Sequence, residues 1–175
     1  MKRPRPIRTP APQAPPMLDA DRFQPVRRRQ LSGPGLRTFL NIADQWRLSE
    51  QERLRLLGLP SRSTFHGRVG KARRGEDITL SVDELIRISA VLGIYKALKI
   101  VFARDDDAAR WLNSANDGPT FGGQSPRALI TSGTQDALML VRRFLDAWRG
   151  GVFAAPLAGF DDIAAPMSDS DLAFV

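Results

Sequence analysis

The chain of 175 residues contains no cysteine and only one histidine, His66. Without cysteine it has no disulfides, no thiol nucleophile and no zinc site with cysteine ligands, which agrees with a reducing compartment. A Ser-His-Asp triad would have to use His66, which lies in a basic segment next to a glycine, where contact with solvent or phosphate is favoured over proton transfer. We therefore expect a protein that is not an enzyme, with no metal, no other cofactor and no small-molecule substrate.

Long apolar runs are also missing. The longest, "ISAVLGIYKALKIVF" at 88–102, is interrupted by two lysines and is shorter than the roughly 20 residues of a membrane span. The N-terminal "MKRPRPIRTPAPQAPP" is basic and proline-rich, but no apolar core region or cleavage site follows, so it does not resemble a secretory signal. We expect a cytoplasmic protein without membrane contact.

Charge is unevenly distributed along the chain. The net charge is +7, yet residues 1–30 hold eight Lys and Arg against two acids, whereas residues 152–175 hold four acids and no cation. A basic arm, a mildly basic body and an acidic tail indicate an anionic partner at one end and a different contact at the other. The alternative is a pair of solvated, disordered ends.

The hydrophobic pattern predicts an all-α fold, because apolar residues recur at helical spacing and no segment alternates as a strand does. We expect folding to begin near Leu36, after a disordered, proline-rich basic arm at 1–33. Two capping boxes, Ser49 with Glu52 and Ser81 with Glu84, mark helix starts, and Gly93 is expected to kink or break the helix that contains it. The helices are expected at 36–46, 49–58, 61–75, 81–93, 94–102, 104–112, 126–131 and 135–149. The predicted organisation is a helix-turn-helix half at 34–102, a small helical domain at 103–151 and an acidic flexible tail at 152–175.

Two short helices joined by "GLPSRS" resemble a helix-turn-helix, whose second helix enters the major groove of DNA. Between Arg53 and Arg74 there are seven Lys and Arg and no acids, a stripe that the phosphate backbone favours through counterion release. The helical wheel turns Phe65 and Val69 inward and leaves polar residues outward. Candidate DNA-binding residues are Arg62, Ser63, Thr64, His66, Arg68, Lys71, Arg73 and Arg74.

Two questions about this helix remain open from the sequence. The basic face can also be a solvated surface with no role in DNA binding. Its glycines, Gly67 and Gly70, each cost about 1 kcal/mol against alanine in a helix interior. They indicate either a recognition helix that becomes ordered only when it binds DNA, or one that has lost its recognition of a specific DNA sequence.

Two further motifs have a structural explanation that we prefer. "FGGQSP" at 121–126 is not a convincing phosphate loop, since no strand precedes it and no lysine or serine follows at P-loop spacing. A glycine turn before a helix capped by Ser125, with Pro126 at its first position, explains it better. The acids at 105–107 suit the first turn of a helix, where the helix dipole favours them, rather than a metal cluster.

The segment "RWLNSANDGPTFGGQSPRALITSGTQDALMLVRRFLDAWRGG" resembles the toxin-binding domain of the Xre/MbcA/ParS antitoxins. Its pattern is Trp-Leu, an Asn, Gly-Gly, a Ser-Pro helix start and a closing helix that ends near glycine. "LNIADQWRLSEQERLRLLGLPSRSTF" through "LIRISAVLGIYKALKIVF" is similar to the Xre-like helix-turn-helix found upstream in the same antitoxins. The resemblance covers about residues 36–151 and is most specific at "RISAVLGIYKAL", "WLN" with "FGGQSP", and "VRRFLDAWRGG".

The resemblance implies an antitoxin of a type II toxin-antitoxin system. It implies a RES-domain toxin that destroys NAD as one partner, occluded by the antitoxin, and operator DNA as another, bound to repress the antitoxin's own operon. Paired half-sites imply a homodimer. The residues implied to shape the toxin-binding domain are Trp111, Leu112, Gly122, Gly123, Ser125, Pro126 and Leu129. Those implied to lie closest to the toxin's NAD pocket are Arg142, Arg143, Arg149, Gly150 and Gly151.

The residues themselves support part of this. Arginines on the outer face of a helix pair well with carboxylates of a partner, although Arg142 and Arg143 can also form a solvated helix face. Aromatic residues at helical spacing usually build a core, so Trp111 and Trp148 are expected to pack rather than to contact the toxin. A stand-alone transcriptional regulator whose C-terminal domain only dimerises remains the alternative, and an orphan antitoxin would have the same sequence.

Overall fold

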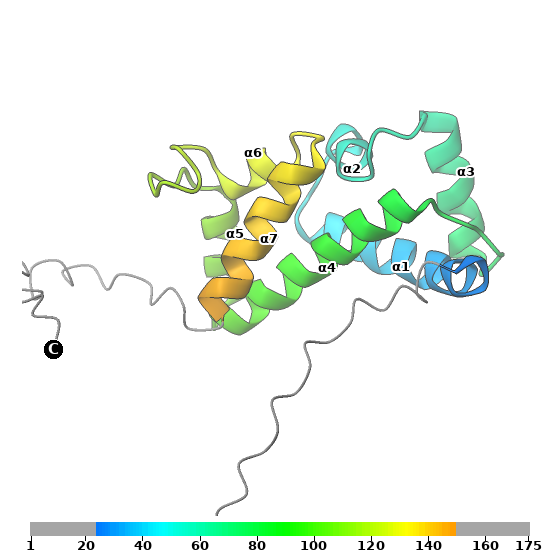
Figure 1. The fold of residues 1–175 in the computed structure, drawn as a ribbon, viewed down its shortest axis with the longest axis horizontal. Helices are drawn as coiled ribbons and strands as arrows, with labels where there is room; N and C mark the ends of the chain where they lie inside the picture. The colour runs from blue at the N-terminus through cyan, green and yellow to red at the C-terminus, as the bar shows by residue number, and fades with distance from the viewer. Residues whose placement is uncertain (1–23, 150–175) are drawn as a thin grey trace, which may run out of the picture.

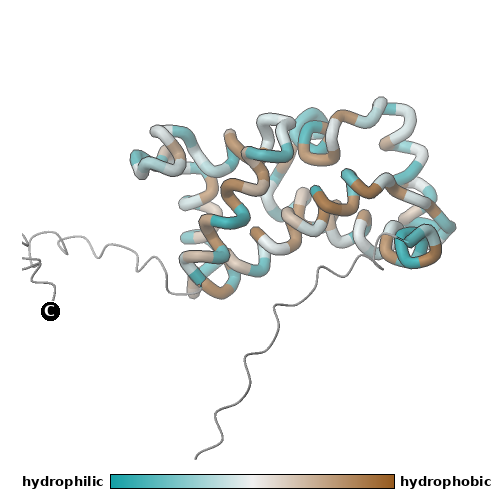
Figure 2. Tube along the Cα trace, viewed as in Figure 1, coloured by the Kyte–Doolittle hydropathy of each residue, from teal (hydrophilic) through white to brown (hydrophobic). Residues whose placement is uncertain are grey.

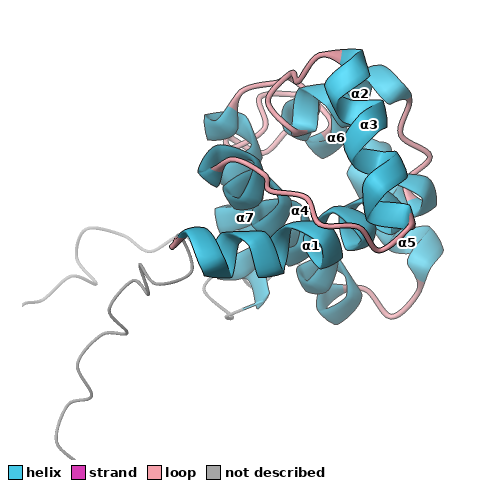
Figure 3. Cartoon of the chain, turned by 90° about the vertical axis from the view of Figure 1, so that its right-hand side faces the viewer, coloured by secondary structure: helices cyan, strands magenta, loops and turns pink. Residues whose placement is uncertain are grey.

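A computed structural model describes residues 24–149, which form helices joined by loops and contain no strand (Figures 1 and 3). This confirms the predicted all-α fold. The helices are α1 (Pro25–Gln45), α2 (Glu50–Leu56), α3 (Arg62–Arg73), α4 (Val82–Val101), α5 (Asp105–Asn113), α6 (Pro126–Ile130) and α7 (Gln135–Arg149).

Helix α1 begins eleven residues before the predicted start, at Pro25 rather than Leu36. The prediction of a disordered arm up to residue 33 is therefore wrong for 25–33. The prolines misled it: Pro25 occupies the first helical turn, where its missing N–H costs nothing, and Pro34 lies inside the helix. Next to Pro34, Gly35 lies close to α4, since a methyl group there would be in ordinary contact with Ile88 Cγ2 at 3.6 Å.

Ser32 ties this first part of α1 to the rest of the fold. Its side chain is fully buried, its hydroxyl donates to the carbonyl of Arg28 at 2.6 Å and it accepts from the backbone N–H of Leu80 at 2.9 Å. Leu80 is 48 residues away in the sequence. Tertiary contact thus holds a segment whose composition predicts disorder.

Helix α4 runs through the molecule from the α2 and α3 side to the α5 and α7 side (Figure 1). It packs against both α1 and α7. The predicted break at Gly93 does not occur, because α4 continues through it to Val101. A Cβ on Gly93 would lie 0.9 Å from Arg142 Nη1, so the glycine makes room for an arginine that crosses from α7.

The helix starts follow the predicted capping chemistry. Both capping boxes are present at α2 and α4, each with a Ser side chain and a Glu side chain satisfying the backbone donors of the first turn. Ser61 and Ser125 cap α3 and α6, and Pro126 stands in the first turn of α6. These local signals are confirmed.

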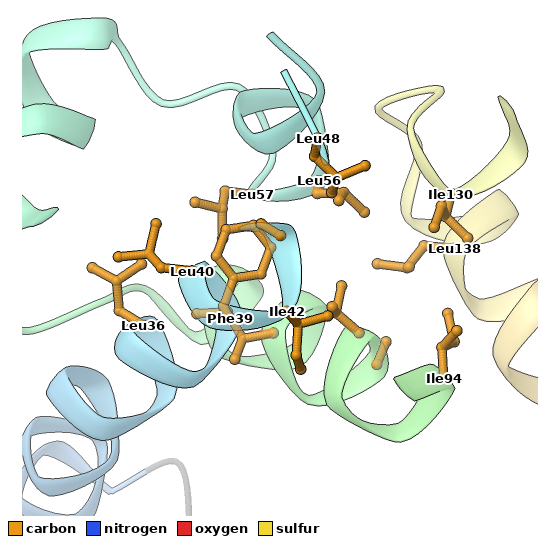
Figure 4. Packing of buried hydrophobic residues seen from close by; sticks show 14 of the residues in the cluster. Leu36, Phe39, Leu40, Ile42, Leu48, Leu56, Leu57, Ile94, Ile130 and Leu138 are labelled. Carbon is orange, nitrogen blue, oxygen red and sulfur yellow. The ribbon is translucent and has the colours of Figure 1, made fainter. Parts of the chain in front are cut away.

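One hydrophobic cluster joins the two predicted halves. Leu36, Phe39 and Ile42 of α1 point toward the same interior as Leu56, Ile94, Ile130 and Leu138 of α2, α4, α6 and α7 (Figure 4). Hydropathy alternates along the helices in the way expected of amphipathic segments (Figure 2). Within residues 24–149, no helix has both the length and the hydrophobicity needed to cross a membrane.

Candidate functional site: the α3 face and the α7 region

Helix α3 presents most of the predicted DNA-binding residues on one side. Phe65 and Val69 are buried, as predicted, and turn the polar positions outward. We call the exposed set the α3 face. It consists of Arg62, Ser63, Thr64, His66, Lys71, Arg73 and Arg74.

Acids from neighbouring segments neutralise part of this face. Glu50 of α2 pairs with Arg62 at 3.3 Å and lies 3.3 Å from His66 Nε2, and Glu76 pairs with Arg74. No carboxylate in residues 24–149 forms an ion pair with Lys71 or Arg73. These two cations are therefore the ones most available to an anionic partner.

Arg68 differs from the other predicted DNA contacts. Its side chain is half-buried and bonded to Glu84, whose own side chain accepts from the backbone of Ser81 as part of the α4 capping box. Glu84 is almost fully buried, so it needs a cationic partner. The structure thus gives Arg68 a role in joining α3 to α4.

Of the predicted toxin-binding residues, Trp111 belongs to an aromatic cluster that also contains Phe102, Phe121, Phe144 and Trp148. Trp111 stacks on Phe144 with ring centroids 6.2 Å apart and lies 5.9 Å from Trp148. Phe121 meets Phe144 edge to face at 4.8 Å. The expectation that Trp111 and Trp148 pack within the protein is confirmed, and the cluster joins α5, the loop before α6 and α7.

Leu112, Ser125, Pro126 and Leu129 act in the same structural way. Leu112 and Pro126 are fully buried, and Leu129 packs against the core. The Ser125 side chain accepts from the N–H of Ala128. These residues therefore contribute to the packing and helix capping of the domain and do not form its exposed surface.

Gly122 and Gly123 form an exposed turn with left-handed backbone angles, φ 56° and 81°. Their N–H groups donate to the carbonyls of Gly118 and Asn116 at 3.1 and 3.0 Å. A phosphate would have to displace these bonds, so the turn explanation of "FGGQSP" is confirmed over a phosphate loop.

The predicted arginines of α7 are not equivalent. Arg142 is half-buried and donates to Asp146 at 2.6 Å and to the carbonyl of Ser89 at 3.4 Å, so it faces α4. Arg149 is 3.5 Å from the other oxygen of Asp146. Arg143 is exposed, and within residues 24–149 its side chain bonds to the carbonyl of Met139 at 3.2 Å and to no carboxylate. Gly150 and Gly151 lie outside the described residues.

Arg127 of α6 was not among the residues predicted from the sequence to be functional. It connects the toxin-binding domain to the helix-turn-helix half. It makes a two-pronged pair with Glu52 of α2, at 2.8 and 3.0 Å. It also donates to the carbonyls of Trp46 and Arg47 and to Asn113. The hydrogen bonds from Arg127 hold the pKa of Glu52 at about 2, below its ordinary 4.5. The sequence carried no local signal for this pair, because Arg127 falls in the last turn of the five-residue helix α6, where a cation suits the helix dipole.

The acids at 105–107 are paired with cations. Asp105 bonds to Lys99, Asp106 to Arg104 and Asp107 to Arg110. Among residues 24–149, no three carboxylate or histidine side chains gather into a group able to hold a metal ion. The three acids lie in the first turn of α5, where negative charge is favourable to the helix dipole.

Comparison with known proteins gives two consecutive family matches. Residues 25–93 match the antitoxin Xre-like helix-turn-helix domain, and residues 97–151 match the antitoxin Xre/MbcA/ParS C-terminal toxin-binding domain. The chain is 40% identical over 116 residues to "Uncharacterized protein y4oB" of Sinorhizobium fredii, an alignment that covers 66% of this chain and 84% of the relative. No solved structure matches. The chain thus consists of a helix-turn-helix domain followed directly by a toxin-binding domain. This succession places it in the Xre/MbcA/ParS family of antitoxins.

Proposed function

We propose that this protein is the antitoxin of a type II pair whose toxin is a RES-domain enzyme that degrades NAD. The antitoxin acts by occlusion, covering the toxin's NAD entrance, and performs no chemistry itself. It also represses its own operon by binding operator DNA. The observation that carries the proposal is the succession of a DNA-binding and a toxin-binding domain on one core.

The α3 face is the proposed DNA contact. Lys71 and Arg73 form no ion pair with a carboxylate in the described chain, so they supply the phosphate attraction that salt weakens. Ser63 and Thr64 stand in the first turn of α3, the part of a recognition helix that reaches base edges. Operators with paired half-sites require a homodimer, and an operator-binding protein acts in the cytoplasm.

The outer side of α7 is the proposed toxin contact. Arg143 is exposed with no carboxylate partner among residues 24–149, whereas Arg142 and Arg149 share Asp146 as an ion-pair partner. Phe121 packs on Phe144, so the Gly122-Gly123 turn belongs to the same region. A guanidinium here can pair with a carboxylate at the toxin's NAD entrance.

Expression of the neighbouring reading frame, alone and with this protein, tests the proposal through growth and cellular NAD. We expect the neighbour alone to deplete NAD and stop growth, and the pair to restore both. Arg143→Glu should weaken rescue by at least about tenfold in the antitoxin level required, while Arg143→Lys retains most of it. A neighbour that is harmless, or a toxin that leaves NAD unchanged, would contradict the proposal of a RES partner.

A second candidate is a stand-alone transcriptional regulator whose C-terminal domain only dimerises. It is favoured by the arrangement of α7, where Asp146 satisfies two of the three predicted toxin-facing arginines within the same helix. In that case the protein would bind its own promoter and form dimers, and Arg143→Glu would have no effect on the neighbour's activity. DNA binding and dimerisation in the absence of any toxin partner would select this candidate.

A further inference from the structure

An apolar groove lies between α1, α4 and α7, with a volume of about 550 Å³. Its walls include Leu31 of α1, Leu85, Ile86 and Leu92 of α4, and Met139 and Arg143 of α7. Leu31 is 48% exposed, and Leu85, Leu92 and Met139 are only partly buried although they pack against the core. An apolar hollow of this volume can accommodate the side chains of another apolar segment.

The charged residues that line the groove indicate which kind of segment it can bind. Arg142 and Asp146, which both line it, neutralise each other at 2.6 Å. Arg143 lines the same edge and uses its Nε for the carbonyl of Met139, and no carboxylate in the described chain forms an ion pair with it. The groove therefore fits a segment that is apolar and acidic.

The chain itself contains such a segment. Residues 152–175 carry four acids and no cation, and their sequence interleaves Phe153, Leu157, Phe160 and Ile163 with Asp161 and Asp162. The other terminal segment, 1–23, holds five Lys and Arg against two acids, the same sign as Arg143. We propose that residues 152–175 bind back into the α1, α4 and α7 groove of their own chain.

Residues 152–175 follow α7 closely enough to reach the groove. Asp146 lines the groove and is three residues from the end of α7 at Arg149, less than one helical turn. Met139, at the far end of the α7 wall, is about 15 Å from Arg149 at about 1.5 Å per helical residue. The twelve residues from Arg149 to Asp161 span up to about 40 Å when extended, which is enough to return along the groove.

If α7 is also the toxin contact, a step that rests on the proposed function, then the bound segment covers Arg143 until the toxin displaces it. The docking itself requires no toxin. It can therefore be tested on the full chain alone, and its outcome is independent of the identity of the toxin.

Paramagnetic broadening provides the test, since the chain has no cysteine and Ala164→Cys accepts a single spin label. We expect the methyl signals of Leu85, Leu92 and Met139 to broaden strongly, while that of Leu59, an exposed residue in the turn between α2 and α3, does not. Uniform weak broadening, with no preference for the groove, would overturn the proposal.

Matched variants of Ser89 and a mixing experiment complete the test. Ser89 is exposed and lines the groove, so Ser89→Glu should reduce the broadening severalfold by repelling the acidic segment, and Ser89→Gln, which has the same size without the charge, should preserve it. Labelled chains mixed with isotopically enriched, unlabelled chains should show no transfer of broadening. Broadening of the unlabelled, enriched chains in the mixture would assign the groove to the segment of a second copy and overturn the intramolecular proposal.

Discussion

Ser32 shows what one buried hydroxyl does for this fold. It satisfies the N–H of Leu80 at the start of α4, so Ser32→Ala leaves that donor buried without a partner. We expect a loss of about 1–3 kcal/mol in the free energy of unfolding, measured by denaturant titration. Thr38→Ala is the control, because the Thr38 hydroxyl bonds only to the carbonyl of Pro34 in its own helix. It should cost less than about 0.5 kcal/mol, and equal losses for the two variants would refute this role.

Glu52 makes the stability of the protein dependent on acid. Its pKa in the folded protein is about 2, against 4.5 ordinarily, so its contribution is complete above pH 4.5 and is lost as the pH falls toward 2. Partial exposure limits the contribution to about 1–2 kcal/mol. The difference in unfolding free energy between the native protein and Glu52→Gln should shrink steadily between about pH 5 and pH 2. A constant difference would show that the Arg127 pair does not stabilise the ionised carboxylate.

Helix α3 and the turn before α6 use glycine for different reasons, and alanine should distinguish them. Gly67 lies inside α3, and a methyl group added there would meet nothing within 4 Å, so Gly67→Ala should stabilise the protein by about 0.5–1 kcal/mol. Gly122 also has open space but stands at φ 56°, so Gly122→Ala should destabilise it by about 1–2 kcal/mol. Thermal unfolding of both variants checks the opposite signs. Shifts of the same sign would refute the backbone explanation.

Substitutions in α3 should distinguish a residue that binds DNA from one that stabilises the fold. Arg73→Gln should lower the slope of log affinity against log salt by about 1 without changing the unfolding temperature, as measured by fluorescence anisotropy on the promoter fragment. Arg68→Gln should instead lower stability by about 1–3 kcal/mol, because it removes the cation from the buried Glu84. Arg110→Gln, in an exposed pair on α5, should change neither. Destabilisation by Arg73→Gln would contradict this division.

At the scale of the whole molecule, a single core predicts a single unfolding transition. Trp46 lies in the DNA-binding half, and Trp111 and Trp148 lie in the toxin-binding half, yet all three pack against one cluster. We expect fluorine NMR of the 5-fluorotryptophan-labelled protein to give three signals that change at the same denaturant concentration. A separate transition for Trp46 would show that the halves unfold independently.

Much of the fold was predictable, because many of its signals are local. The serine caps, the capping-box glutamates and the periodic apolar residues act within one or two turns, and α2, α3, α5, α6 and α7 lie close to where these signals place them. The family resemblance was carried by short motifs of the same kind. The α3 face followed from the inward positions of Phe65 and Val69.

The errors occurred where a distant residue decides the local structure. Composition predicts disorder at 25–33, but contacts of Leu80 with Ser32 and of Asp77 with Arg29 hold that segment in α1. Gly93 resembles a helix breaker until Arg142 is seen to occupy the space above it. Arg68 stays a predicted DNA contact, but its ion pair with Glu84 could not be foreseen from the sequence.

The sequence by itself therefore determined the helical class, the family and the helix starts that capping residues mark, since these depend on neighbours in the chain. Only the tertiary structure decided which charges are available to a partner. Ion pairs such as Arg127 with Glu52 and Arg68 with Glu84 join residues 75 and 16 positions apart, and a buried carboxylate takes the nearest cation in space, whatever its distance in sequence. Within residues 24–149, that competition leaves Lys71, Arg73 and Arg143 as the cations without a carboxylate partner on the two proposed binding surfaces.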